Sequence, residues 1–287
     1  MEVNAEMFTS TLSVPELALL TDLQAVPLTQ VMGVSVQQIG WQYLPPEAQW
    51  GGSELFCELD RIGHAWDQAR RQALDRMAAE ALAAQADAVV GVTLERGEHD
   101  LGRRTVDFIV RGTAIRWAGA QRANWPVLTD LSAQDYWLLQ RAGWAPAGFV
   151  GSTAVYFVSQ GFSTRWRRRR QFASNQELIE FSDAFSAARH AAVRQLRSQA
   201  DAAGGDGVVG VALQHSLASG SFKTAQVGMW QRPTYSPTTI GMGAQAPMRG
   251  ADQRSGLVIT IQAAGTAIRR AAAVERYPPQ QTLMVSR

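Results

Sequence analysis

The stretch of sequence that decides the fold occurs twice, as Ala86-Asp87-Ala88-Val89-Val90-Gly91-Val92 and as Gly205-Asp206-Gly207-Val208-Val209-Gly210-Val211. Asp206 follows Asp87 by 119 residues, and the seven positions align at that offset without a gap. Each stretch ends an alanine-rich helical pattern and begins an apolar, β-branched run, which is typical of a buried strand. The sequence therefore predicts two structural repeats.

A long helix is predicted before each stretch, over residues 65–86 and 184–204. Small and apolar side chains recur there at steps of three and four, as on a helix with one buried face. The buried face is expected to comprise Trp66, Ala69, Ala73, Met77, Ala81 and Ala84 in the first helix, and Phe185, Ala188, Ala192, Leu196, Ala200 and Ala203 in the second. Alanines let a helix axis lie close to a sheet, so each helix is expected to cover one.

The other elements recur as well. A short helix is predicted over residues 12–23, where Ser13-Val14-Pro15-Glu16 combines a capping serine, an early proline and an acid, and Ser132-Ala133-Gln134-Asp135 repeats the signal. Strands are predicted at residues 31–39, 89–95 and 105–116, and again at residues 150–158, 208–215 and 258–269. Each repeat therefore contains a helix, a strand, a long helix and two further strands.

The last strand of each repeat ends with the same pentapeptide, Gly112-Thr113-Ala114-Ile115-Arg116 and Gly265-Thr266-Ala267-Ile268-Arg269. The offset here is 153, so 34 residues are inserted in the second hairpin. The insertion, at about residues 219–256, is expected to be a long mobile loop. Its Met and Trp residues suit a partner-binding loop as well as an incidental insertion. Residues 118–129 are expected to be an irregular linker.

An α+β domain with a three-stranded antiparallel sheet and one long helix leaves one face and both edges of the sheet uncovered. Such sheets usually complete themselves by association. The sequence therefore predicts a homo-oligomer.

The composition is that of a globular chain of 287 residues, with 46% hydrophobic and 18% charged residues. A net charge of +2 is too small to identify a partner. The single cysteine, Cys57, cannot form an internal disulfide, and the first residues, Met1-Glu2-Val3-Asn4, lack the basic start of a secretion signal. Apolar runs are far shorter than the ~20 residues that span a bilayer. We expect a cytoplasmic protein.

The repeated stretch, followed about 20 residues later by Gly-Thr-Ala-Ile, resembles the YbjQ-like family, which is labelled for heavy-metal binding. The segment from Gly143 to Val150, followed by Ser152-Thr153-Ala154-Val155-Tyr156, resembles members with an extra N-terminal helix. The resemblance covers residues 12–118 and 131–271. It implies two tandem dodecin-like domains, each a three-stranded antiparallel sheet with a long helix, and assembly into pentameric rings.

The resemblance is weakest at the start of the long helix. Single-domain members carry a Gly-Gly-Arg-Ser-like segment there, followed by a tyrosine and a glutamate. This chain has Gly63-His64-Ala65-Trp66 and Ser182-Asp183-Ala184-Phe185 instead. Any function of that segment is therefore not carried over by the resemblance.

Candidate metal ligands are sparse. Soft metals need Cys and His brought together at short spacing, and the four histidines, His64, His99, His190 and His215, show no such spacing with each other or with Cys57. Glu95, Glu98, His99 and Asp100 could bind a hard metal in the first hairpin turn, although a solvated turn has the same composition. A site built between subunits remains open.

Other candidate residues also have bland alternatives. The basic run Arg165, Trp166, Arg167, Arg168, Arg169 and Arg170 could bind nucleic acid or anionic lipid, or could pair with acidic side chains. Asp87 and Asp206 are expected to accept hydrogen bonds from backbone amides at their turns rather than to be catalytic. Gly91, Gly112, Gly210 and Gly265 complete this structural motif.

No Gly-x-Ser-x-Gly, phosphate-binding glycine loop or Cys/His dyad is present in the sequence. The sequence thus favours a non-enzymatic, ring-forming scaffold or binding protein. The alternatives are a metal- or small-ligand-binding sequestration protein with sites between subunits and, with least support, an enzyme with an interface-built active site.

Overall fold

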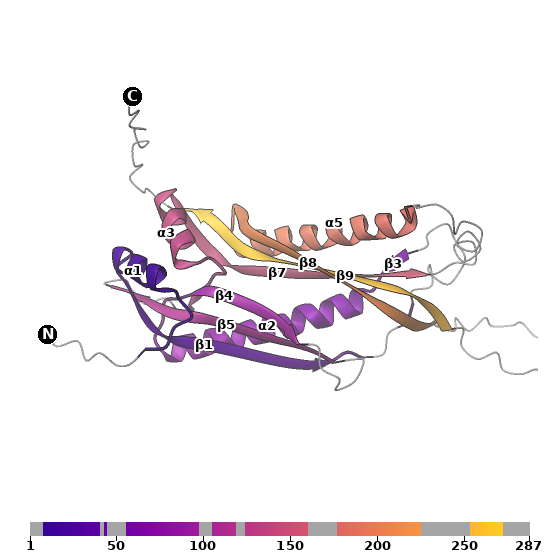
Figure 1. Cartoon of the computed structure of the whole chain (residues 1–287), viewed down its shortest axis with the longest axis horizontal. Helices are drawn as coiled ribbons and strands as arrows, with labels where there is room; N and C mark the ends of the chain where they lie inside the picture. Colours follow the sequence, from indigo (N-terminus) through magenta and orange to yellow (C-terminus); the bar gives the residue numbers. More distant parts are fainter. Residues whose placement is uncertain are drawn as a thin grey trace, which may run out of the picture.

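The computed structural model describes residues 8–40, 43–44, 56–97, 105–118, 124–159, 177–224 and 253–271. These residues form four helices and two sheets, so the predicted α+β class is confirmed (Figure 1). Sheet A has the strand order β1-β5-β4-β6, and sheet B has the order β2-β8-β9-β7-β3. No helix in these ranges is long and apolar enough to cross a membrane.

Sheet A is built on an antiparallel core of three strands, β1 (Ala25–Gln38), β5 (Thr105–Trp117) and β4 (Ala88–Gly97). The short strand β6 (Val127–Leu128) is added in parallel to the outer edge of β4. Helix α1 (Val14–Asp22) precedes β1, and helix α2 (Asp60–Ala83) packs on β1 and β5.

Sheet B has the same antiparallel core in β7 (Trp144–Ser159), β9 (Gln253–Arg270) and β8 (Gly207–Thr224). Helix α3 (Ala133–Arg141) precedes β7, and helix α5 (Ile179–Ala202) packs on all three strands. Two short strands from the segment between β1 and α2 join this sheet, β2 (Tyr43–Leu44) beside β8 and β3 (Phe56–Glu58) beside β7.

The prediction of three-stranded sheets is therefore wrong in number, because the sheets contain four and five strands. The additional strands are two or three residues long, too short to show an alternating pattern in the sequence. One of them, β6, lies in the predicted irregular linker. The second hairpin also extends further than expected, since Lys223 pairs with Gln253. Residues 225–252, most of the predicted insertion, lie outside the described residues.

The two halves of the chain place their elements at nearly constant spacing. Helix α5 begins and ends 119 residues after α2, and α3 begins and ends 119 residues after α1. Strands β7 and β8 begin 119 residues after β1 and β4, and β9 ends 153 residues after β5. A residue and the one that follows it at these offsets are called counterparts below.

Helix α2 lies against both sheets. Its small residues Ala69, Ala73 and Ala81, with Met77, are fully buried, as predicted. They let β1 approach so closely that a Cβ on Gly33 would lie 2.0 Å from the carbonyl oxygen of Ala73. The opposite side of α2 meets β7 of sheet B. Helix α5, by contrast, packs only on sheet B, and its opposite side is exposed (Figure 1).

Candidate functional site

The predicted metal candidates are not brought together by the described structure. Glu95 lies on β4, where its carboxylate pairs with the guanidinium of Arg111 on β5. Glu98, His99 and Asp100 lie outside the described residues. Among the residues that the structure describes, no three His, Cys, Asp or Glu side chains gather closely enough to hold a metal ion. The side chains present in these ranges therefore do not fit the metal in the family's label.

The remaining soft ligands are dispersed. His64 lies on α2, His190 on α5, and His215 on β8, where its ring packs edge-on against Phe185 at 5.9 Å between centroids. Cys57 is half-buried in β3, opposite Phe157. The basic run, Arg165 to Arg170 with Trp166, lies outside the described residues.

Asp87 and Asp206 make matching hydrogen bonds. The Asp87 carboxylate accepts the backbone N–H of Trp117 at 2.9 Å, and Asp206 accepts that of Arg270 at 2.9 Å. The two acceptors and the two donors are counterparts. Each amide belongs to the neighbouring strand rather than to the turn itself, so each aspartate joins the start of one strand to the end of the next.

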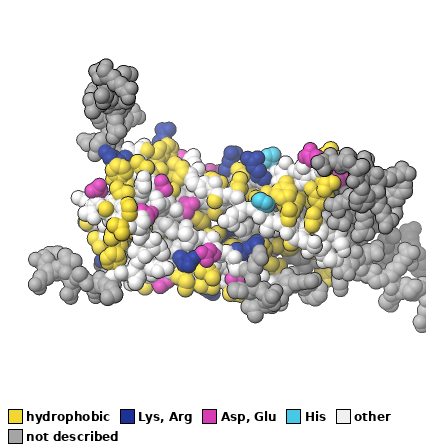
Figure 2. All heavy atoms as spheres, viewed as in Figure 1, with side chains coloured by type: hydrophobic (Ala, Val, Ile, Leu, Met, Phe, Trp, Pro, Cys, Tyr) yellow, Lys and Arg dark blue, Asp and Glu magenta, His cyan; other side chains and the backbone are white. Residues whose placement is uncertain are grey.

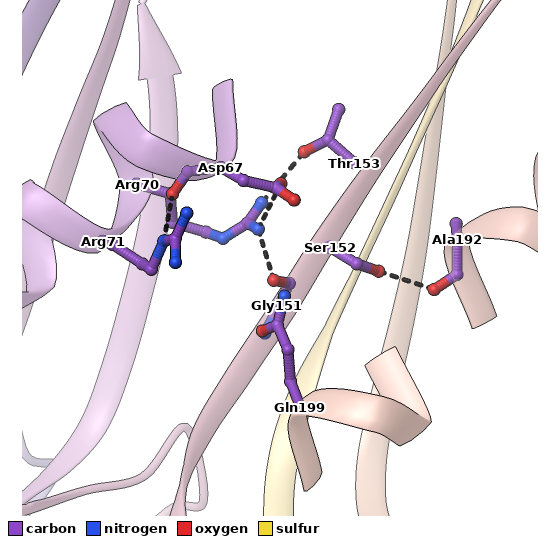
Figure 3. A network of polar contacts seen from close by, with 8 residues as sticks. All are labelled: Asp67, Arg70, Arg71, Gly151, Ser152, Thr153, Ala192 and Gln199. Carbon is purple, nitrogen blue, oxygen red and sulfur yellow. Dashed lines mark hydrogen bonds and ion pairs between the residues drawn. The ribbon is translucent and has the colours of Figure 1, made fainter. Parts of the chain in front are cut away.

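The largest buried polar cluster joins α2 to β7 (Figure 3). Arg70 of α2 is only 2% exposed, and its guanidinium donates to Asp67 Oδ1 at 2.6 Å, to Thr153 Oγ1 at 3.0 Å and to the carbonyl oxygen of Gly151. On the other face of β7, Ser152 Oγ donates to the carbonyl of Ala192 in α5 at 2.7 Å. Strand β7 is therefore held by a helix from each half of the chain.

Burial lowers the pKa of Arg70, and the neighbouring Asp67 carboxylate partly opposes this shift. Removing either charge from such a buried pair leaves the other without compensation. Because the guanidinium is buried and already donates to protein acceptors on two elements, this cluster is suited to fixing the position of β7 on α2. It is not an exposed binding site.

A second polar cluster, which we call the threonine clasp, holds residues 127–131 on β9. Thr129 Oγ1 lies 2.8 Å from Thr266 Oγ1, and Thr266 Oγ1 accepts the backbone N–H of Asp130 at 3.1 Å. Thr266 also donates to the Asp130 carboxylate. Residues 8–12 form the counterpart clasp on β5, where Thr113 Oγ1 accepts the N–H of Thr11 at 3.0 Å and lies 2.9 Å from Thr11 Oγ1.

The clasp predicts a pH dependence of stability. Burial raises the pKa of Asp130, although its hydrogen bond from Thr266 acts in the opposite direction. A raised folded-state pKa means that the folded chain binds more protons than the unfolded chain, so stability falls as pH rises through the window above ~4. Asp130→Asn should remove this contribution.

We expect Asp130→Asn to gain thermal stability relative to the wild type as pH increases from about 4 to 7. Melting temperatures measured across that range check the result. Asp135→Asn, which changes an exposed carboxylate on α3, is the matched control. A difference between Asp130→Asn and the wild type that does not change with pH would contradict the role of the carboxylate.

Residues 127–131 also cover the edge of β4. The N–H groups of Gly91 and Val92 donate to the carbonyls of Leu131 at 2.9 Å and Thr129 at 3.0 Å. They can do so because β4 has a bulge between Val90 and Thr93, where Gly91 has a φ of +63°. Strand β8 has the counterpart bulge at Gly210, with a φ of +67°.

The glycines opposite these bulges lie in tight packing. A Cβ on Gly112 would come within 2.5 Å of Val89 Cγ1, and one on Gly265 within 2.8 Å of the Val209 carbonyl oxygen. The four glycines of the repeated motif therefore serve the bulges and the close strand packing around them.

Three surfaces are open in one half of the chain and covered in the other. Val211 on β8 is 45% exposed, whereas its counterpart Val92 is 4% exposed beneath residues 127–131. On β1, Val36 is 56% exposed, whereas its counterpart Val155 is 1% exposed. On α5, Arg189 is exposed, whereas its counterpart Arg70 is buried against β7.

The open side of α5 carries a shallow hollow of about 720 Å³. Figure 2 shows basic side chains gathered over this helix. The hollow is lined by Arg189, His190, Val193, Arg194, Arg197, Ser198 and Asp201. These open surfaces, rather than a cluster of reactive side chains, are the candidate functional site.

The sequence reasoning did not single out Arg70, the threonine clasp or the exposed side of α5. Signals for them were present. Arg70 and Arg189 are identical at the offset of 119, and Thr113 and Thr266 lie in the repeated pentapeptide. What the sequence did not contain was which of the two counterparts would be covered.

Comparison with known proteins gives two matches. Residues 57–118 match the YbjQ family model, described as "Putative heavy-metal-binding". The chain is also 37% identical over 210 residues to the encapsulin nanocompartment protein Rv1762c of Mycobacterium tuberculosis, an alignment that covers 71% of this chain and 76% of that protein. No solved structure matches. With this identity over most of both sequences, the chain belongs to the family of the encapsulin nanocompartment protein Rv1762c, and it contains a YbjQ-family domain at residues 57–118.

Proposed function

We propose that the chain is a tandem duplication of one dodecin-like, YbjQ-like domain, with the two domains at residues 12–118 and 131–271. The matching hydrogen bonds support this proposal, since the aspartate contacts, the two clasps and the two glycine bulges all occur at counterpart positions. Residues 57–118, which match the family model, belong to the first of these domains.

We further propose that the protein is a non-enzymatic scaffold or binding protein that assembles into a homo-oligomeric ring. The observation that carries this proposal is the difference in cover between counterparts. The edge of β4 and the outer side of α2 are covered within the chain, whereas the edge of β8 beside Gly207–Val211 and the outer side of α5 are open. Open strand edges and apolar faces of this kind favour association.

The arrangement of the two domains limits the form of the ring. They contact each other through unlike surfaces, which is a head-to-tail interface, and such interfaces generate closed rings or open filaments. Because each chain supplies two domains, a single ring in which they alternate contains an even number of domains. The pentamer that the family resemblance implies would then carry ten domains in one ring. This arrangement replaces the alternative of two stacked layers, because the domains already lie side by side with α2 between the sheets.

The function of the scaffold is proposed from its relative. The M. tuberculosis protein is named as an encapsulin nanocompartment protein. We propose that this chain likewise associates with an encapsulin shell, in the cytoplasm. The alternative of metal or small-ligand sequestration receives no support from the side chains in the described ranges.

Co-expression with the encapsulin shell protein of the same organism tests this function. The untagged chain is expected to sediment with assembled shells in a density gradient and to remain with them at high salt. An exposed-surface variant of an unrelated cytoplasmic protein of similar mass serves as the control for trapping. Sedimentation of the chain only at its own mass, in the presence of intact shells, would contradict the association.

A further inference from the structure

We propose that a second copy of this chain docks head to tail on the first, with its residues 8–12 lying parallel to β8 beside residues 207–211. This inference rests on the self-association proposed above and specifies its interface. The occupant is inferred from the contact that the chain already makes between its own two halves.

The internal contact provides the template. Residues 127–131 lie along β4 with Val127 N–H donating to the Asp87 carbonyl at 3.1 Å and Thr129 N–H donating to the Val89 carbonyl at 3.0 Å. The bulge at Gly91 returns two further hydrogen bonds, to Leu131 and Thr129. Four backbone hydrogen bonds thus attach this segment to the strand edge.

Residues 8–12 are held in the same way on their own half of the chain. Besides the clasp with Thr113, Ser10 Oγ accepts the N–H of Leu12 at 2.9 Å, as Thr129 Oγ1 accepts that of Leu131 at 3.2 Å. Thr9 Oγ1 also accepts the N–H of Gln30 on β1 at 3.2 Å. The segment is therefore fixed before any partner arrives, and ordering it costs little on binding.

Transferring the template to the open edge assigns the hydrogen bonds between two copies. Phe8 N–H would donate to the Asp206 carbonyl, and Ser10 N–H to the Val208 carbonyl. In return, Val211 N–H would donate to the Ser10 carbonyl, and Gly210 N–H to that of Leu12. The bulge at Gly210 and the 45% exposure of Val211 show that this edge has the shape of β4 without its cover.

A second surface supports the same docking. Within the chain, Arg70 of α2 reaches the Gly151 carbonyl and Thr153 on β7. The counterparts of these groups are Arg189 on the open side of α5 and Met32 and Val34 on β1. Met32 is 51% exposed. Docking a second copy by the internal template places its β1 over α5, which would cover Met32 and Val36 and bring Arg189 to the Met32 carbonyl.

The occupant is a second copy rather than the same chain. Residues 8–12 are bonded to Thr113 in sheet A, whereas the open edge belongs to sheet B. The two surfaces are unlike, so each copy offers one to the copy before it and the other to the copy after it.

Chemical cross-linking tests the docking. In the internal template Val127 lies opposite Ala88 in the strand pairing, so Phe8 of one copy would lie opposite Gly207 of the next. With Cys57→Ser as background, the double variant Phe8→Cys/Gly207→Cys treated with a short bismaleimide should give a ladder of cross-linked chains. Either single variant alone should give no product, because the contact is between unlike surfaces. The pair Ala88→Cys/Val127→Cys should cross-link without joining chains.

A charge on the open edge provides the second measurement. Val211→Lys should reduce the oligomer to single chains, because it places an ammonium group beneath the docked segment. Leu217→Lys is the matched control, since Leu217 is 53% exposed on the same strand but lies beyond residues 207–211. An oligomer that gives no ladder and survives Val211→Lys would overturn this docking and leave self-association standing. A wild-type mass of one chain would overturn both.

Discussion

Arg70→Ala is expected to destabilise the protein by about 3–5 kcal/mol, because it removes one partner of a buried ion pair. Asp67 is buried and would lose its partner, and the carbonyl of Gly151 and the hydroxyl of Thr153 would lose a donor from α2. The contact between α2 and β7 would weaken at the same time. Urea unfolding followed by circular dichroism measures the change.

Two further variants separate the ion pair from general damage to α2. Arg71→Ala changes the next residue, which is exposed, and should alter stability by no more than ~0.5 kcal/mol. The double variant Asp67→Ala/Arg70→Met should lose less than the sum of its single changes, because neither charge is then left alone. Full additivity, or an Arg70→Ala variant as stable as the wild type, would contradict the cluster as described.

Gly33→Ala is expected to destabilise the protein by about 3 kcal/mol, at the upper end of what overpacking costs. A Cβ at this position would lie 2.0 Å from the Ala73 carbonyl oxygen and 2.7 Å from the Met77 nitrogen, both of which are backbone atoms of α2. The helix would have to move away from β1. The midpoint of urea unfolding, compared with that of the wild type, gives the size of the effect.

Gly40→Ala is the control for this substitution. It makes the same change in the same half of the chain, at a position where a Cβ would meet nothing within 4 Å. It should be neutral or slightly stabilising, because alanine reduces the freedom of the unfolded chain. Equal losses for the two variants would mean that the close approach of β1 and α2 is not what limits residue 33.

The elements of the fold could be predicted where a pattern runs over many residues. The alanine steps predicted the long helices to within five residues of α2 and α5, since a 24-residue helix repeats its buried face several times. Strands β2, β3 and β6 could not be predicted, because two or three residues carry no period. Their pairing depends on segments that are distant in sequence.

The candidate site could be predicted only in part. The repeated motif indicated uncovered edges and association, and the hydrogen bonds of Asp87 and Asp206 lie within that motif. The sequence could not show that β7 would be buried on both faces while β1 is exposed on one, because Val155 and Val36 are the same residue type at counterpart positions. That difference depends on which half of the chain has a neighbour.

The native mass of the full-length, untagged protein tests self-association most directly. Native mass spectrometry at micromolar protein should give a single species whose mass is an integer multiple, of two or more, of the 31.3 kDa chain. The multiple also gives the number of chains in the ring. A single species at 31.3 kDa would mean that the edge of β8 and the outer side of α5 need no partner, and it would contradict the scaffold proposed here.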